Sequence, residues 1–229
     1  MKLQSILFAV AGVVTLTFPA IADDSPSALE KTSKGWIDLL EKAGPALEGW
    51  TRVSIPPAPK GKLKEKSQWS IDPKTGHLIC EGNLGHEWLR WDELIGNGIY
   101  HVEWRFTPVE GKKGYNSGIY ARNSADGTVW HQAQTGSASG GFLFGETPSA
   151  PDGKLTRINV GNDPKATRVK PAGEWNTFEI TCEGTQLSLW VNGAVTAVFN
   201  KCEVPRGHVG IEAEGYRIEF RNVKLKPLP

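Results

Sequence analysis

The sequence predicts an all-β fold, in the form of an antiparallel two-sheet sandwich or jelly roll. Five short runs in the last third alternate apolar and polar residues, which is the period of strands that bury one face. Gly and Asn turns separate the runs, and Asn192-Gly193 is the strongest hairpin signal in the chain. No helical pattern intervenes, which favours a sandwich or jelly roll. The runs cover residues 176–184, 186–193, 194–201, 207–215 and 216–226.

The composition limits the partners that the protein can have. The chain has 229 residues, enough for one domain with a substantial core, and a formal net charge of +1. A charge this small gives no field that would attract nucleic acid or an anionic membrane surface. The nine Trp residues are unusual. Their flat rings either fill a β core or stack on sugars, and the core is the commoner place for any one of them.

The first 22 residues have the pattern of a signal peptide. Lys2 precedes an apolar run over residues 6–18, and Ala20-Ile21-Ala22 is a small-x-small cleavage pattern. The apolar run is shorter than the roughly 20 residues that a membrane-spanning helix needs. The sequence therefore predicts one domain over residues 23–229, periplasmic or secreted, with no membrane span. Its oligomeric state is left open.

Export also bears on the three cysteines, because disulfides form in oxidising compartments. Cys182 and Cys202 flank a predicted hairpin, which makes a bridge between them the first choice. Cys80 lies in a run with the character of a buried strand and is expected to be a free core thiol. Nothing close to it in sequence would lower its pKa and make it a nucleophile.

The rest of the chain is less regular. Residues 25–34 suit a short helix or a ragged tail, and residues 35–50 are expected to form a short strand with a loop. Residues 54–66 are rich in Pro and Lys and read as an exposed loop. Two strands are expected at residues 68–73 and 77–82, around the turn Pro73-Lys74-Thr75-Gly76. Residues 145–175 are expected to be a long loop that covers one side of a site, with Glu146, Asp152, Arg157 and Asn162 as its candidates for reaching a ligand.

Residues 99–145 contain the strongest functional signal. Three alternating runs there each bury one face, so each leaves a polar face free. The first run buries Tyr100, Val102, Trp104 and Phe106, and the second buries Ile119 and Ala121. In the third, Trp130, Gln132 and Gln134 lie opposite Ala133. If the three strands are neighbours, their free faces form one polar floor edged with aromatic residues, and this floor is the candidate site.

Two carboxylates on a later strand can join the floor. In the run at 207–215, Ile211 and Ala213 face inward, which turns Glu212 and Glu214 to the same outer side. A segment between the strands, residues 86–92, crowds aromatic and charged side chains. It suits either the rim of a site or a strand with a solvated outer face.

The motifs, taken in order, resemble the 3-keto-disaccharide hydrolase domain family, a bacterial exported family. Each motif is weak alone, but their order and spacing are specific, and they span roughly residues 35–226. They are WIDLLEKAGPALEGW, GHLICEG, the EWR of Glu103 to Arg105, YNSGIYAR, KPAGEWNTFEI, LWVNG and IEFRNVKLK. The resemblance implies a concanavalin A-like lectin/glucanase jelly roll with a sugar-binding face. It also implies hydrolase- or lyase-type cleavage of glycosides oxidised at C3.

The resemblance also implies site residues. Glu103 matches the family's Glu in the strand before the NSG motif, Asn116-Ser117-Gly118 matches that motif, and Arg122 matches the Arg that follows. Two departures concern carboxylates. Where the family usually has Glu-x-Gln this chain has Gln132-Ala133-Gln134, and where members often have Gln-x-His or Gln-x-Asp it has Glu212-Ala213-Glu214. Either a carboxylate has moved across the floor, or the site is altered or inactive.

A carbonyl at C3 acidifies the proton on C2, so the glycosidic bond can break by proton abstraction and elimination. This route needs a base, donors or a cation for the enolate oxygen, and an acid for the leaving oxygen. The hypothesis is that Glu212 or Glu214 is the base and Arg122 the electrophile. The candidate residues are Glu212, Glu214, Arg122, Glu103 and His101 for catalysis, and Arg105, Asn116, Ser117, Tyr120, Trp130, Gln132, Gln134, Trp88 and Trp91 for substrate binding.

The candidate residues also have alternative interpretations. Glu103 and Arg122 suit a cross-strand ion pair equally well, Glu212 and Glu214 suit a solvated face, and His131 suits a core histidine. The runner-up function is a non-catalytic, lectin-like glycan-binding module that stacks sugars on Trp88, Trp91 and Trp130. Ordinary glycoside hydrolysis by the Glu212–Glu214 pair is a third option. No cofactor is predicted: a divalent metal held by carboxylates and carbonyls is possible in such jelly rolls, but the chain has no Asp-rich loop of the calcium-binding kind.

Overall fold

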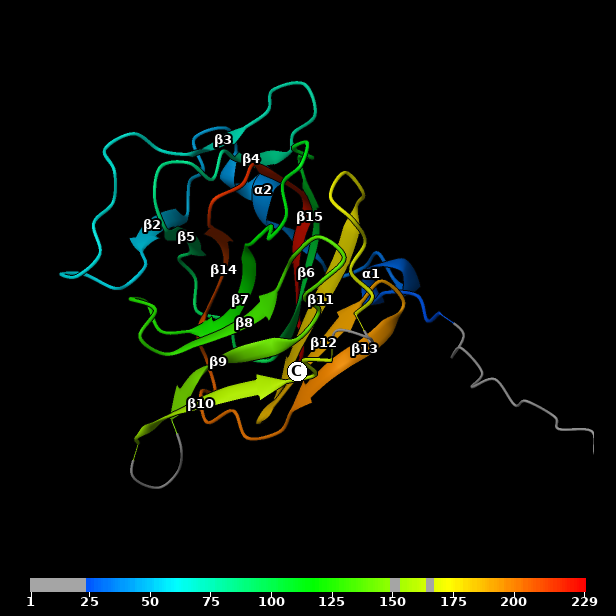
Figure 1. The fold of residues 1–229 in the computed structure, drawn as a ribbon. Helices are drawn as coiled ribbons and strands as arrows, with labels where there is room; N and C mark the ends of the chain where they lie inside the picture. Colours follow the sequence, from blue (N-terminus) through cyan, green and yellow to red (C-terminus); the bar gives the residue numbers. More distant parts are fainter. Residues whose placement is uncertain (1–23, 149–152, 164–166) are drawn as a thin grey trace, which may run out of the picture.

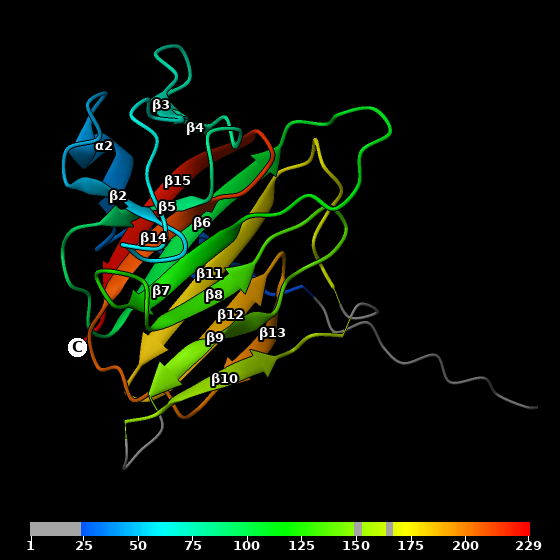
Figure 2. The same cartoon turned by 60° about the vertical axis from the view of Figure 1, so that its left-hand side comes forward.

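Two antiparallel sheets pack face to face in the computed structural model, which describes residues 24–148, 153–163 and 167–229. Figures 1 and 2 show the layers: β14, β7, β8, β9 and β10 run side by side in one, and β15, β6, β11, β12 and β13 in the other. The predicted all-β sandwich is confirmed. The predicted signal peptide at residues 1–22 lies outside the described residues.

One sheet has eight strands in the order β13-β12-β11-β6-β15-β4-β3, with β1 also paired to β15, and the other has seven in the order β10-β9-β8-β7-β14-β5-β2. The strands of the first are β1 (Ile37–Asp38), β3 (Trp69–Ile71), β4 (Leu78–Cys80), β6 (Gly98–Phe106), β11 (Asn176–Glu183), β12 (Gln186–Val191), β13 (Ala194–Phe199) and β15 (Ile218–Pro227). The strands of the second are β2 (Trp50–Ser54), β5 (Glu87–Trp91), β7 (Gly118–Asn123), β8 (Trp130–Gln134), β9 (Leu143–Pro148), β10 (Leu155–Val160) and β14 (His208–Ala213).

The core between the sheets comes from the inward faces that the alternation predicts. On β6, Tyr100, Val102, Trp104 and Phe106 are each at most 1% exposed. The Trp104 ring meets the ring of Phe178 on β11 edge to face, with centroids 5.3 Å apart. Aromatic pairs of this geometry add about 0.5–1.5 kcal/mol beyond the area that they bury.

The last third folds as predicted, into β11 to β15. Asn192 (φ 42°) and Gly193 (φ 111°) form the turn between β12 and β13, because positive φ suits Asn and Gly. The Asn192 side chain fixes this turn: its Oδ1 accepts from the Thr177 amide at 2.8 Å and its Nδ2 donates to the Arg168 carbonyl at 2.8 Å. The hairpin prediction is confirmed.

Two segments differ from their predictions. Residues 35–50 contain, besides β1, a short helix α2 (Leu39–Ala43), which begins at Asp38 because that carboxylate accepts from the Leu40 and Glu41 amides. The expected long loop at residues 145–175 contains most of β9 and all of β10, which extend the seven-stranded sheet. Their weak apolar pattern reflects the edge position of β10, in which four of the six residues are exposed.

The segment at residues 25–34 forms a four-residue helix, α1 (Ala28–Lys31), on the outer face of the eight-stranded sheet. The Ala28 and Leu29 amides donate to the Glu179 carboxylate on β11, at 2.7 and 3.1 Å. The same carboxylate accepts from Nδ1 of His101 at 2.8 Å, and the His101 side chain is only 2% exposed. In the described part of the chain, no helix is long and apolar enough to cross a bilayer.

The predicted Cys182–Cys202 disulfide is wrong, because all three cysteines are buried free thiols. The Cys202 sulfur instead lies 3.7 Å from Nε2 of His131, whose Nδ1 lies 3.2 Å from the Ala121 carbonyl. Burial lowers the pKa of His131 to about 4, so it is a neutral core histidine, which confirms the core interpretation of this residue. Burial also raises the pKa of Cys80 to about 12, which makes a Cys80 nucleophile untenable.

A buried ion pair supports the end of β5 and gives a stability prediction. The Glu87 carboxylate, 2% exposed, accepts from Arg52 Nε at 2.9 Å and Nη2 at 2.7 Å, and from the Trp69 indole at 2.8 Å. Arg52→Ala would leave this charge buried and uncompensated, so we expect the free energy of unfolding to fall by about 3–5 kcal/mol. Urea denaturation of the wild type and the variant measures this change in the free energy of unfolding. As a control, Lys42→Ala breaks the exposed pair with Glu93 and should cost less than about 1 kcal/mol.

Candidate active site

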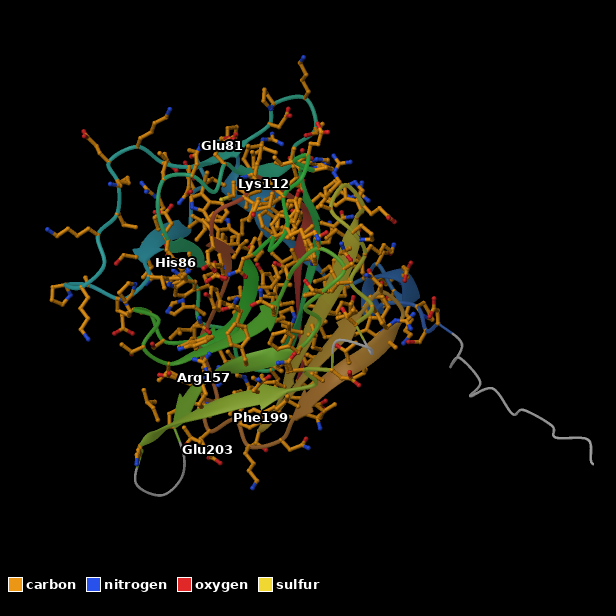
Figure 3. All side chains as sticks on the ribbon, viewed as in Figure 1. Glu81, His86, Lys112, Arg157, Phe199 and Glu203 are labelled. Carbon is orange, nitrogen blue, oxygen red and sulfur yellow. The ribbon has the colours of Figure 1, made fainter. Side chains whose placement is uncertain are left out.

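A pocket of about 680 Å³ lies on the outer face of the seven-stranded sheet. It extends from the loop after β2, where Pro56 and Pro57 line it, to Arg157 on β10 at the other edge of the sheet. Figure 3 labels His86 near β5 and Arg157 near β10, towards the two ends of the pocket. The pocket therefore crosses the sheet, and the central strands form its floor.

The floor comes from three neighbouring strands, β8, β7 and β14. Tyr120 pairs with Gln132 across β7 and β8, so their side chains lie side by side on the outer face. Glu212 lies on the same face of β14, because Ile211 and Ala213 on either side of it are completely buried. The second and third runs of residues 99–145 thus meet the Glu212–Glu214 strand, as their alternation predicts.

Glu212 is the central group of the floor and is only 3% exposed. Its Oε1 accepts from the Tyr120 hydroxyl at 2.7 Å, and its Oε2 accepts from the Gln132 amide at 2.8 Å. Nε2 of His86 is 2.8 Å from Oε1. These contacts to both oxygens hold the Glu212 carboxylate in one position at the floor of the pocket.

Two glycines make this arrangement possible. A Cβ on Gly118 would lie 2.1 Å from the Gln132 amide nitrogen, so Gln132 reaches Glu212 only because position 118 has no side chain. A Cβ on Gly210 would lie 2.5 Å from the Trp88 ring, which packs in the corresponding space over β14. The glycine of the Asn116-Ser117-Gly118 motif therefore has a packing role at the site, in addition to any role in a turn.

Glu214 is the accessible carboxylate, with 39% of its side chain exposed. Its Oε2 accepts from the Asn116 amide at 2.5 Å, and the Asn116 oxygen accepts from the Gln134 amide at 2.5 Å. Burial raises the pKa of Glu214 above its usual value, and the nearby Glu212 charge raises it further. A carboxylate with a raised pKa is a stronger base once ionised.

His86 faces both carboxylates from the loop before β5. Its Nε2 is 2.8 Å from Glu212 Oε1 and 3.8 Å from Glu214 Oε2. Burial lowers the pKa of His86, but the hydrogen bond and charge of Glu212 outweigh it, so the net shift is upward. The crowding of residues 86–92 signals a site in the sequence, yet it does not single out this histidine.

We call Glu212, Glu214 and His86 the acid–imidazole cluster. One ligand-type atom from each lies within 4.8 Å of the others, a set that suits a divalent cation. However, both oxygens of Glu212 already accept hydrogen bonds from Tyr120 and Gln132, so a cation would compete with His86 for Oε1. A metal bound there would polarise a substrate carbonyl. The hydrogen bonds satisfy the cluster without one.

Aromatic rings form the wall towards β10. Trp130 and Phe144 meet edge to face with centroids 5.1 Å apart, and Phe142 lies 5.5 Å from Phe144. We call these three residues the aromatic shelf, and all three line the pocket. Trp88 lines it too, although its ring is only 1% exposed. Trp91 does not: it is 2% exposed in the core and packs against Trp50, which corrects its predicted role as a stacking plate.

The first run of residues 99–145 does not join this floor, which corrects the predicted site. It forms β6 in the eight-stranded sheet, so His101, Glu103 and Arg105 lie on the opposite side of the sandwich from Glu212. Glu103 accepts from Arg221 Nε and Asn222 Nδ2, each at 2.6 Å, so its partner is Arg221 and not Arg122. Burial opposes these hydrogen bonds and that of His101, yet together they lower the pKa of Glu103 to about 2.

The predicted position of Arg122 in the floor is also wrong. It has φ 53°, and the pairing of β7 with β14 shifts register next to it, so a β-bulge interrupts the alternation. Its guanidinium is turned away from the pocket and donates to the Gly184 carbonyl at 2.5 Å and to Asn97 Oδ1 at 3.2 Å. Arg122 is 1% exposed and does not line the pocket, whereas Asn123 does.

Two further predicted binding residues, Arg105 and Ser117, contact no part of the pocket. Arg105 pairs with Glu219 at 2.9 Å on the other sheet. Ser117 is completely buried, and its hydroxyl donates to the Glu212 carbonyl at 2.8 Å, so it supports β14 from behind. Of the candidates in the covering segment, Arg157 and Asn162 line the pocket, Glu146 pairs with Arg157, and Asp152 lies outside the described residues.

Comparison with known proteins places the chain in a family. The model of the 3-keto-alpha-glucoside-1,2-lyase-like domain matches residues 35–226. The chain belongs to this family. The family is one of glycosyl hydrolase-like, carbohydrate-active domains, so the resemblance stated from the motifs is confirmed. No curated protein matches the chain in sequence.

Solved structures confirm the jelly roll at low sequence identity. A glycosyl hydrolase candidate from Parabacteroides distasonis is 18% identical, with a TM-score of 0.60 over 90% of this chain and 100% of its own. A LamA variant from Z. galactanivorans, in complex with laminaritriose and laminaritetraose, is 9% identical, with a TM-score of 0.56 over 79% and 92%. The carbohydrate-binding module CBM66 from Bacillus subtilis is 13% identical, with a TM-score of 0.53 over 77% and 94%. These likenesses establish the fold.

Proposed function

We propose that this domain cleaves 3-keto-glycosides in the pocket on the seven-stranded sheet. The observation that supports this is the acid–imidazole cluster: an accessible carboxylate of raised pKa, Glu214, lies beside a histidine whose pKa is also raised. A base and a cation in contact suit abstraction of the C2 proton next to a C3 carbonyl. Family membership supports the same substrate class.

In the proposed reaction, Glu214 takes the proton from C2, and the electron pair moves towards the C3 carbonyl to give an enolate. Protonated His86, adjacent to Glu214, stabilises the enolate oxygen, the task that Arg122 cannot perform from the core. The enolate then expels the oxygen on C1, and the proton that Glu214 took from C2 passes to this oxygen, so that the group leaves as an alcohol. The products are the alcohol and an enone, to which water can add in a hydrolase.

The exchange of carboxylate and amide positions fits an intact site. The resemblance leads one to expect a Glu at the position of Gln132 and a Gln at the position of Glu212. The two side chains touch in this structure, with Gln132 Nε2 at 2.8 Å from Glu212 Oε2. Exchanging them keeps one carboxylate and one amide in contact at the same place. This supports a carboxylate that has moved across the floor.

Two incubations test the proposal. Release of alcohol from a 3-keto-glucoside but not from the unoxidised disaccharide would support C2 proton abstraction. Release from both would point to ordinary retaining hydrolysis, because oxygens of Glu212 and Glu214 lie within 4.8 Å, close to the ~5 Å spacing of retaining glycosidases. Binding without release would indicate a lectin-like module that stacks sugar on Trp130.

We also propose, from residues 1–22, that the domain acts in the periplasm or outside the cell.

The roles of Glu214 and His86 predict a bell-shaped pH dependence of kcat/KM. Activity should rise with pH as Glu214 ionises, at a pKa above its usual value, and fall as His86 loses its proton, above its usual 6.5. His86→Gln should lower activity and remove the alkaline decline, since Gln does not titrate. A profile from pH 4 to 9 on a 3-keto-glucoside measures both limbs. An alkaline decline that persists in His86→Gln would contradict this role.

A further inference from the structure

The pocket has a second end, on β8, β9 and β10, which the acid–imidazole cluster does not use. Trp130, Glu146 and Arg157 are in register across these strands. Trp130 is two strands from β14, about 10 Å at the usual strand spacing. One sugar ring cannot contact both ends. If C2 chemistry takes place at Glu214, this end has room for the group attached to C1, so the inference below rests on the proposed function.

The aromatic shelf holds a positive charge at this end. The Arg157 guanidinium carbon lies 4.7 Å from the centroid of Trp130 and 5.3 Å from that of Phe144, so it is a cation–π contact with two rings. Stacking limits the conformations of a long side chain and keeps the guanidinium at the pocket wall. Asn159, which pairs with Phe144 in the β9–β10 register, and Asn162 add amide groups that line the same end.

The charge of Arg157 is only weakly neutralised by the protein. In the described part of the chain its one carboxylate partner is Glu146, at 3.5 Å through Nη1, with side chains 55% and 42% exposed. Such exposed pairs contribute little and exchange readily. A guanidinium has five N–H donors in a planar fork that matches a carboxylate. Arg157 can therefore pair with an anionic group on a ligand at small cost.

We propose that this end of the pocket is a leaving-group subsite that selects glycosides whose leaving group is a ring bearing a carboxylate, such as a uronic acid. The shelf supplies apolar contact for the ring, and Arg157 supplies the charge-assisted hydrogen bonds. The pocket is then electrically polarised, with carboxylates beneath the reacting sugar and a cation beside the leaving group. A carboxylate at the opposite end would lie against Glu212 and Glu214, so the charges also fix the orientation of the substrate.

The test compares two matched disaccharides, glucosyl-glucose and glucosyl-glucuronate, each as its 3-keto form. The wild-type protein should cleave the acidic substrate with a kcat/KM about tenfold higher, the value of one charge-assisted contact. Arg157→Gln should abolish this preference, and Trp130→Ala should weaken the turnover of both substrates. Arg206→Gln, which removes an exposed arginine outside the pocket, should keep the preference. Added salt should reduce it in the wild type, because Arg157 is exposed.

Calorimetry with the unoxidised pair separates this inference from the proposed function. Tighter binding of glucosyl-glucuronate that depends on Arg157, without cleavage of either keto sugar, would support the subsite and overturn the lyase proposal. Equal turnover of both keto sugars by the wild type would overturn the subsite and leave the lyase proposal intact. A preference for the acidic substrate that survives in Arg157→Gln would also overturn the subsite proposal.

Discussion

Glu214→Gln is expected to lower kcat on a 3-keto-glucoside by about 10²–10⁴, the contribution of a positioned general base. Gln has nearly the same shape and can still accept from Asn116, but it cannot take a proton. The fold should be unaffected. The pKa of Glu214 is raised, so the folded state disfavours its charge, and removing that charge beside Glu212 does not destabilise the domain.

Single-turnover kinetics and a thermal melt together test this expectation. The control is Glu203→Gln, which removes an exposed carboxylate labelled far from His86 in Figure 3, and it should leave both quantities unchanged. Full activity in Glu214→Gln would show that the base is a different group. If Glu214→Gln melts well below the wild type, its low activity would not report on catalysis. Glu214→Asp, which keeps a carboxylate but shortens its reach, is then the variant to measure.

Gly118→Ala should reduce kcat/KM by about 10- to 100-fold, although it adds only a methyl group. The new Cβ would lie 2.1 Å from the Gln132 amide nitrogen, so Gln132 must leave its position against Glu212. Losing a hydrogen bond to a charged group costs about 1.5–3 kcal/mol. Gly118 does not have a positive φ, so Ala fits the backbone and the loss arises from the displaced side chain.

A double-mutant cycle identifies the cause. If the displaced Gln132 accounts for the effect, then Gln132→Ala alone should lower activity by a similar factor, and the double variant should be no worse than either single one. Gly96→Ala is the matched control, because the nearest atom to its Cβ is the Arg206 side chain at 3.8 Å. Additive losses in the cycle would mean that Gly118 affects the site by another route.

The sequence contains enough to predict the fold and half of the site. Strict alternation places Tyr120, Gln132, Gln134 and Glu212 on one outer face, and the order of the motifs points to the family. Alternation fixes which face of a strand a residue occupies. It does not fix which sheet the strand joins, and β6 pairs with β11 and β15 instead of β7. This is why Glu103 was expected in the floor.

Two other errors have local causes. Arg122 leaves the floor at a β-bulge, and a bulge adds one residue without a clear signal in a single sequence. His86 enters the site from a loop, where no period indicates direction, and it reaches Glu212 across 126 positions of sequence. Residues that converge from distant loops depend on tertiary packing, which a pattern within one strand does not describe.

The position of α1 determines which sheet holds the start of the described chain, and therefore which sheet an attached group would lie next to. Glu179 and His101 hold the start of the described chain against the eight-stranded sheet, and the pocket opens on the other sheet. The described chain starts beside the turn between β12 and β13, where the Ser25 amide donates to the Gly193 carbonyl at 2.7 Å, so an affinity handle or surface anchor joined there would be attached to the eight-stranded sheet. Immobilised in that way, the domain would display its pocket outward, open to large soluble glycosides.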